Sequence, residues 1–239
     1  MIPAGDGVRV LFRVESEGPR GRSGFRMAAA LRPPAAARLE FLGPVGGTRL
    51  LVATDGERAT AILPSERQFD IAPGTPASMD RLLGLPLDGE RLIALLSGAP
   101  MCRPERVRRS AAQGPTPTTG GGELVACPPG DIGFSGVGGE PGGPLRSAAL
   151  SDGGSGAIIA EVEYDDILAG PGGRWPRDIR LKLPLTDVAI KFTILDGPVA
   201  ARLADDLFAP IIPDGFEHRP IFAGAGDPAL YGAGHDTGP

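Results

Sequence analysis

Side chains that could support catalysis are few in this chain, and their spacing is poor. A Ser-His-Asp site would have to use His218, because His235 lies close to the C-terminus. The stretches GFSGV at 133–137 and GGSGA at 153–157 both lack the final glycine of a nucleophile elbow, and neither stands between a strand and a helix. The cysteines and histidines are too scattered for a zinc site, and no glycine-rich phosphate loop is present. We therefore predict a protein that is not an enzyme and has no cofactor or metal.

Acidic side chains would be the other source of chemistry. Glu161, Glu163 and Asp165 alternate along one stretch, and Asp205 and Asp206 are adjacent. Such carboxylates can bind calcium or act as acid and base. A solvated strand face and a turn explain the same spacing, and we expect these side chains to lie in water.

Cys102 and Cys127 bracket a segment rich in proline, glycine and arginine. A disulfide between them is one interpretation, and closing a loop of that size would contribute about 3–4 kcal/mol in the chain-entropy model. Two unpaired thiols are the alternative.

The composition indicates many turns and few long helices. Glycine and proline account for 37 and 26 of the 239 residues. The net charge of −5 comes from mixed acidic and basic residues, which argues against a nucleic-acid-binding surface. The chain opens with MIPAGDG and shows no signal peptide, and its longest uncharged apolar run, 92–102, is too short to cross a bilayer. We expect a cytosolic protein, or an exported one whose signal lies outside this chain.

Alternation of apolar and charged residues predicts antiparallel strands in both halves. In residues 8–16, the side chains of Val8, Val10, Phe12 and Val14 share one face, and charged side chains share the other. About ten strands are expected, at residues 8–16, 25–31, 38–41, 48–54, 58–63, 67–71, 145–150, 157–164, 179–183 and 188–194. Between the halves, 101–143 is predicted to be a loop insertion with one short strand near 123–127. Residues 224–239 read as a disordered tail.

Residues 75–98 predict two short helices amid these strands. Thr75 and Asp88 are suited to N-cap positions, and Gly84 and Gly98 to left-handed C-caps. Leucines repeat at helical spacing in both segments. Helices this short need an apolar support, and we expect them to form a lid over a curved sheet.

The predicted sheet is wide, and an antiparallel sheet of this size curls. Two short helices supply few large side chains, so the space beneath them can be a cavity for an apolar ligand. The alternative is that each lining residue is an ordinary core residue. The predicted lining residues are Phe12, Phe25, Met27, Leu39, Phe41, Leu50, Val52, Ile62, Met79, Leu82, Leu83, Leu92 and Leu96.

The order of elements from residue 8 to 98 resembles the LolA/LolB-like lipoprotein carriers of bacterial envelopes, LolB in particular. The resemblance rests on the strand beginning at Gly24, the Gly-Pro-Val-Gly turn at 43–46, the Asp-Gly hairpin at 55–56 and the stretch GLPLDGERLIALLSG at 84–98. Residues 176–181, PRDIRL, also look like that family's C-terminal strands. The resemblance implies a mainly β protein, with a single curved antiparallel sheet that forms an unclosed half-barrel under a short-helix lid. It also implies one domain over 1–223.

The same resemblance implies a function and a location. Family members hold acyl chains of lipids or lipoproteins in the apolar cavity, and Val45 matches the position of an apolar residue that protrudes from a loop in LolB. From this resemblance we expect a monomeric protein that lies on the periplasmic face of the outer membrane and contacts the membrane surface. A lipidation cysteine, which LolB carries at its N-terminus, is not visible in this chain.

Three functions therefore remain open from sequence. The first is a carrier of lipids or lipoproteins. The second is a structural or assembly envelope lipoprotein of the same fold, with its interior filled by its own side chains. The third is a hydrolase that uses His218.

Overall fold

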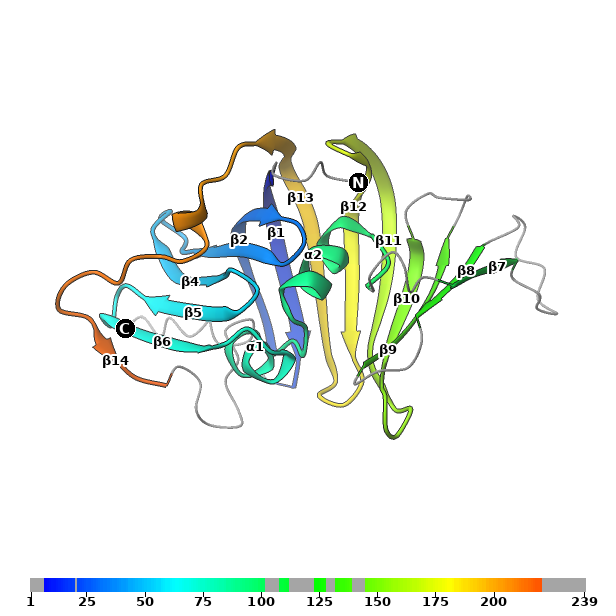
Figure 1. The fold of residues 1–239 in the computed structure, drawn as a ribbon, viewed down its shortest axis with the longest axis horizontal. Coiled ribbons are helices and arrows are strands. Elements are labelled where there is room, and N and C mark those ends of the chain that lie inside the picture. Colours follow the sequence, from blue (N-terminus) through cyan, green and yellow to red (C-terminus); the bar gives the residue numbers. More distant parts are fainter. Residues whose placement is uncertain are drawn as a thin grey trace.

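The computed structural model describes residues 7–19, 21–101, 108–111, 123–127, 132–138 and 145–220. These residues form one curved, unclosed sheet with two short helices against its concave face (Figure 1). The order of the fourteen strands in the sheet is β14-β6-β5-β4-β3-β2-β1-β13-β12-β11-β10-β9-β8-β7. Neighbouring strands are antiparallel, except for the parallel pair β14 and β6.

The first half of the chain contributes β1 (Gly7–Gly18), β2 (Gly21–Arg32), β3 (Ala36–Leu42), β4 (Thr48–Thr54), β5 (Arg58–Leu63), β6 (Gln68–Pro73), α1 (Pro76–Leu83) and α2 (Gly89–Ser97). The second half contributes β7 (Arg108–Ala111), β8 (Glu123–Cys127), β9 (Ile132–Gly138), β10 (Leu145–Asp152), β11 (Ile158–Gly170), β12 (Gly173–Leu183), β13 (Val188–Ala201), the 3₁₀ turn η2 (Asp205–Leu207) and β14 (Glu217–His218).

The sheet consists of two meanders joined at one seam. Strands β1 to β6 follow one another outward on one side, and β13 back to β7 do so on the other. The seam is the pairing of β1 with β13, in which Arg13 lies opposite Thr193. The predicted alternation holds here, because Val8, Phe12 and neighbouring apolar residues of β1 are buried on the concave face while the arginines between them are exposed.

Both helices begin and end where the sequence predicted. The Thr75 hydroxyl accepts a hydrogen bond from the Ser78 amide at 3.4 Å, and the Asp88 carboxylate accepts one from the Arg91 amide at 2.9 Å. Gly84 and Gly98 end the helices with φ of 72° and 67°, a conformation that glycine adopts without a Cβ penalty.

A C-terminal strap, defined as residues 202–218, crosses the outer face of the first meander (Figure 1). Its apolar side chains form two small clusters with the sheet, one around Phe208 and Ala30 and one around Ile212 and Leu51. Arg32 lies over the Phe208 ring, 4.6 Å from its centroid, and donates a hydrogen bond to the Leu203 carbonyl at 3.1 Å. The strap ends at β14, which pairs with β6 and forms this edge of the sheet.

The expectation of a loop insertion with one short strand at 101–143 is wrong at the described residues. Besides β8, which was predicted, the segment contains β7 and β9. The sequence of β9, IGFSGVG, has glycine at three of its seven positions and a weak intrinsic preference for strand. It is a strand because it hydrogen-bonds to β8 and β10 on its two sides. The side chains of Cys102 and Cys127, and the tail at 224–239, lie outside the described residues.

Candidate functional site

The lid, defined as α1, α2 and the connection between them, bridges the concave face of the sheet. Helix α1 contacts β5, whereas α2 contacts both β3 and β12. Three strands, β2, β1 and β13, separate β3 from β12 in the sheet. Helix α2 therefore reaches across the curve from one wall to the other, above a floor that includes Phe12 and Phe192, whose ring centroids are 6.2 Å apart.

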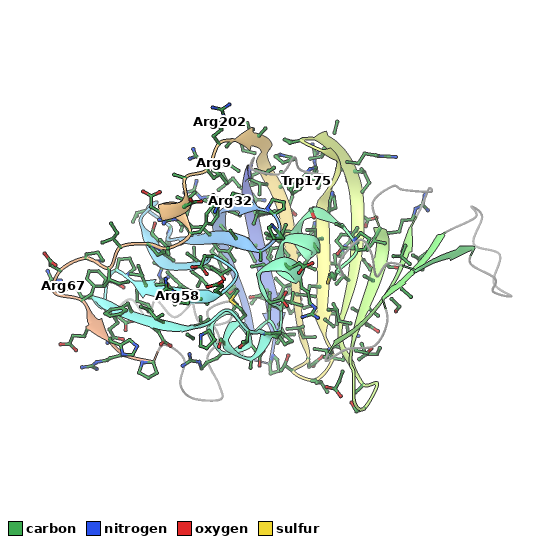
Figure 2. The ribbon with its side chains drawn as sticks, viewed as in Figure 1. Arg9, Arg32, Arg58, Arg67, Trp175 and Arg202 are labelled. Carbon is green, nitrogen blue, oxygen red and sulfur yellow. The ribbon has the colours of Figure 1, made fainter. Side chains whose placement is uncertain are left out.

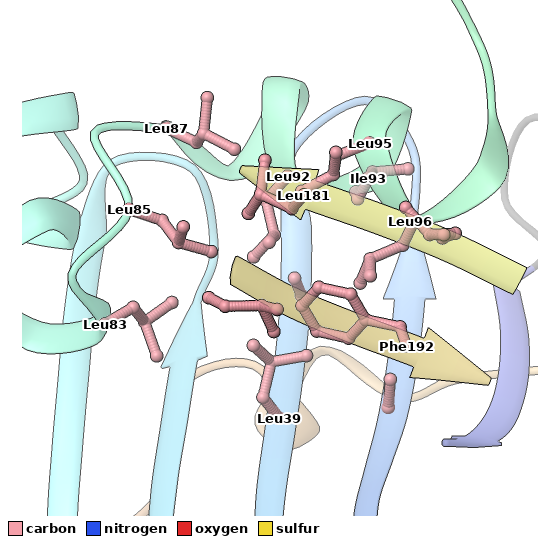
Figure 3. Close-up of a cluster of buried hydrophobic side chains, with 14 of the residues drawn as sticks. Leu39, Leu83, Leu85, Leu87, Leu92, Ile93, Leu95, Leu96, Leu181 and Phe192 are labelled. Carbon is pink, nitrogen blue, oxygen red and sulfur yellow. The ribbon is translucent and has the colours of Figure 1, made fainter. Parts of the chain in front are cut away.

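Most of the predicted lining residues come together under the lid. They belong to one cluster of buried hydrophobic side chains, against which the partly buried Phe25 also packs. The members among the predicted residues are Phe12, Met27, Leu39, Phe41, Leu50, Val52, Met79, Leu82, Leu83, Leu92 and Leu96. In Figure 3 the lid leucines lie above Leu39 and Phe192 of the sheet. In this structure these side chains contact one another, so an open cavity at this place stays a prediction.

The prediction for Ile62 is wrong. Ile62 packs on the outer face with Leu51 and Ala53, beside Phe216 of the strap. Ala59 and Ala61, which alternate with Thr60 and Ile62 on β5, face the concave side and are fully buried. Small side chains at those positions leave room for α1, and the strap gives Ile62 its apolar surroundings.

Several residues of the concave cluster were missed from sequence. Leu85 and Leu87 lie in the connection between the helices, where no periodic pattern marks them as buried, yet both are below 5 % exposed. Leu181 and Phe192 come from the second meander (Figure 3). Their strand alternation was recognised, but only the β1–β13 seam brings them opposite the lid.

Tyr164 places a hydroxyl in this apolar interior. Its side chain on β11 is 4 % exposed, and its Oη has no hydrogen-bond partner among the described residues. Burial raises the pKa of Tyr164 well above the ordinary 10.0, because a phenolate would be poorly solvated there. An unsatisfied buried hydroxyl costs about 1–3 kcal/mol, and it can donate to an acceptor that enters the interior.

A polar link connects the lid to the sheet edge. The Asp70 carboxylate on β6 is almost fully buried and lies 3.1 Å from Arg81 Nη1 of α1. Its other oxygen is 3.6 Å from His218 Nε2 of β14. Asp70 therefore holds α1 and the end of the strap to the same strand.

Val45 stands at the tip of the turn between β3 and β4 and is 100 % exposed. The turn is closed by hydrogen bonds between backbone groups of Gly43 and Gly47 at 2.8 Å and of Gly46 and Gly43 at 3.0 Å. The protruding position that the sequence predicted for Val45 is thus present.

No helix in the described ranges has the length and apolar character needed to cross a membrane. No three His, Cys, Asp or Glu side chains in the same ranges gather in a way that could hold a metal ion.

Comparisons with known proteins identify the fold. No family model matches the sequence, and neither does any curated protein. Among solved structures, a LolA superfamily protein from Nitrosomonas europaea matches with a TM-score of 0.60 at 10 % identity, over 85 % of this chain and 90 % of that one. A putative outer membrane lipoprotein-sorting protein domain from Vibrio parahaemolyticus matches with a TM-score of 0.60 at 9 % identity, over 85 % and 89 %. A DUF1329 family protein from Desulfovibrio piger matches with a TM-score of 0.62 at 10 % identity, over 86 % and 90 %.

The chain therefore has a LolA-like fold, which confirms the predicted class: a mainly β protein with one curved, unclosed sheet and two short helices. The identities near 10 % establish this fold and leave the activity to be argued from the site.

Proposed function

We propose that this chain binds acyl chains of lipids or lipoproteins between the lid and the concave face of the sheet. The observation that carries the proposal is the placement of α2, which contacts β3 and β12 across three intervening strands above an apolar floor. At the C-cap of α2, the Gly98 carbonyl accepts a hydrogen bond from the Leu145 amide of β10 at 3.1 Å, so the helix can shift by pivoting at this end while its side-chain contacts with β3 and β12 break.

The free energy needed to expose the buried leucines of the lid is similar in size to the free energy gained when an acyl chain is buried. Five leucines of the two helices, Leu82, Leu83, Leu92, Leu95 and Leu96, are at most 2 % exposed. At about 1.5–3 kcal/mol each, exposing them all would cost on the order of 10 kcal/mol. An acyl chain gains about 0.8 kcal/mol per buried methylene, so roughly 12 methylenes offset the full cost. A lid that shifts and keeps part of its contacts needs fewer, and a lipid with several acyl chains has a surplus.

The proposal extends to a place in the bacterial envelope. The solved structures that share the fold include a putative lipoprotein-sorting domain. Val45, which by sequence resemblance corresponds to the protruding loop residue of LolB, is exposed. We propose that the protein acts as a monomer at the periplasmic face of the outer membrane, where Val45 touches the lipid surface. Binding of this kind requires no catalytic group, cofactor or metal, and no nucleic acid.

A photoactivatable fatty acid methyl ester tests the carrier function directly. The purified full chain is titrated with the ester, irradiated and digested, and the labelled peptides are identified by mass spectrometry. We expect saturable labelling at concave-face positions such as Phe12, Leu39 and Leu92. Leu51 and Ile62 are internal controls, because they are equally apolar but lie under the strap on the outer face. Labelling without saturation, or confined to the outer face, would contradict the proposal.

The second candidate is a structural or assembly envelope protein of the same fold. The packing of lid leucines on Leu39 and Phe192 favours it, because an interior filled by the protein's own side chains needs no ligand. Native mass spectrometry of freshly purified protein separates the two. Co-purifying lipid supports the carrier, and a bare chain that also fails to bind the ester supports the structural role.

A further inference from the structure

Two arginines lie directly opposite each other on the outer face of the sheet. Arg13 on β1 pairs with Arg26 on β2 in the antiparallel register. Both side chains are exposed, whereas Phe12 and Val14, which flank Arg13, are fully buried on the concave face. Cβ atoms of such a pair are about 4.5–5.5 Å apart, so one small anion can contact both guanidinium groups.

Neither guanidinium makes an ion pair or hydrogen bond with another side chain in the described part of the chain. On the neighbouring strand, the hydroxyl of Thr193 opposite Arg13 already donates to the Asp178 carboxylate at 2.7 Å. Glu15 is the next residue of β1 on the outer face, and it lies opposite Lys191 of β13. Like charges that face each other across a strand pair are destabilising, so this pair lowers stability unless an anion joins it.

A cavity of about 450 Å³ begins next to the pair. Leu11 and Ala28 line this cavity and lie opposite each other on β1 and β2. Each is two residues before or after the arginine of its own strand, so all four side chains are on the same face. Two residues along a strand correspond to about 6.6–6.8 Å. Leu207 of the strap and Val199 of β13 also line the cavity, so it has an apolar wall beside a basic rim.

The charged side chains that line this cavity balance, two arginines against two carboxylates, so the positive excess comes from Arg13 and Arg26 beside it. Glu40 lies in its lining, but its carboxylate is 2.7 Å from Arg38 Nε and 3.2 Å from the Thr48 hydroxyl. Asp196 accepts a hydrogen bond from the Gly197 amide at 2.9 Å, and Arg9 lines the same cavity (labelled in Figure 2). With Arg13 and Arg26 added, four arginines stand against two carboxylates.

We propose that this outer face binds an amphiphilic phosphate, with the phosphate between Arg13 and Arg26 and a short apolar chain over Leu11 and Ala28 in the cavity. Two guanidinium groups and a phosphate form charge-assisted hydrogen bonds, the stronger class of such bonds. The site lies on the face opposite the lid and is independent of acyl binding under α2.

Calorimetric titration at fixed ionic strength, with hexyl phosphate and with inorganic phosphate as probes, tests the site. We expect hexyl phosphate to bind at least about tenfold more tightly, which corresponds to burial of roughly two methylenes. The variant R13Q/R26Q is expected to weaken binding of both probes by about tenfold or more. The matched control R58Q/R146Q removes the same charge from two exposed arginines outside the site and is expected to leave both affinities unchanged.

A second variant separates the phosphate contact from the cavity. Ala28→Leu fills the cavity floor, so we expect it to keep the affinity for inorganic phosphate and to lose the preference for hexyl phosphate. R13Q/R26Q also removes a repulsive pair, so its midpoint of denaturation is expected to stay level or rise, which rules out unfolding as the cause of lost binding.

Three results would overturn the assignment. Equal binding by R13Q/R26Q and R58Q/R146Q would show that the arginine pair is not the anion site. Equal affinity for the two probes would reduce the site to one for free phosphate, and an unchanged preference in Ala28→Leu would remove the cavity from it.

Discussion

Replacing Tyr164 with phenylalanine is expected to stabilise this protein. The change removes only the hydroxyl, which is buried in an apolar cluster without a partner among the described residues, and keeps the ring that packs there. Relief of an unsatisfied buried hydroxyl is worth about 1–3 kcal/mol. For a chain of this size, each kcal/mol shifts Tm by about 2–4 °C. Thermal or urea denaturation at pH 7 measures the difference.

The pH dependence supplies a second, independent readout for Tyr164→Phe. Burial raises the pKa of Tyr164 in the folded state, while the unfolded state keeps an ordinary pKa near 10.0. Below that pH, the hydroxyl is protonated in both states, so it does not make the free energy of unfolding depend on pH. Above it, the unfolded state loses a proton that the folded state retains, so wild-type stability falls by about 1.4 kcal/mol per pH unit. Phenylalanine does not titrate, so the difference in free energy of unfolding between the variant and the wild type is expected to increase above pH 10.

A destabilised Tyr164→Phe variant would refute this reasoning, because it would mean that the hydroxyl is hydrogen-bonded in the folded protein. A difference that stays constant from pH 7 to pH 11 would contradict the burial argument specifically. Denaturation of both proteins in parallel, with the midpoints compared at each pH, distinguishes these outcomes.

Three further substitutions probe the lid and the protruding loop. Gly89→Ala is expected to destabilise despite the higher helix propensity of alanine, because the added Cβ would lie 2.0 Å from the Ala35 carbonyl oxygen in the turn between β2 and β3; a more stable variant in a denaturation assay would show that α2 does not approach this turn so closely. Arg81→Met is expected to cost about 1–2 kcal/mol, since it removes a partner of the buried Asp70 carboxylate, and to increase hydrogen exchange in α1; unchanged exchange there would mean that the ion pair does not hold the lid. Val45→Asp is expected to leave stability within about 0.5 kcal/mol and to reduce delivery of a lipopeptide to phospholipid vesicles, and equal delivery by the variant would remove this residue from the transfer step.

The local elements could be predicted because their signals are local. Thr75, Gly84, Asp88 and Gly98 mark helix ends through hydrogen bonds and backbone angles that depend only on near neighbours. Alternation in β1 likewise separates buried from exposed residues within one strand. The order of these elements was enough to indicate the LolA-like half-barrel, which the comparisons then confirmed as the fold.

The candidate site was predicted in part. Leu39 and Leu92 follow strand and helix periods, and both lie where the periods place them. Ile62 was placed on the wrong face, because alternation shows which residues share a face but not which of the two faces the lid covers. On β5 both faces are covered, one by α1 and the other by the strap, so an apolar side chain could pack on either.

Taken alone, the sequence determined the caps of the helices, the strands whose apolar and charged residues alternate, and the apolar stripe that each of these elements buries, but it did not reveal β7 and β9. The tertiary structure decided which stripes meet: that Phe192 lies beneath α2, that the strap covers Ile62, and that Arg13 faces Arg26 beside a cavity. The reason is physical. Propensity and periodicity act over a few residues, whereas the seam of β1 and β13 joins residues as far apart in the sequence as Arg13 and Thr193, and nothing local to either strand selects the other as its partner.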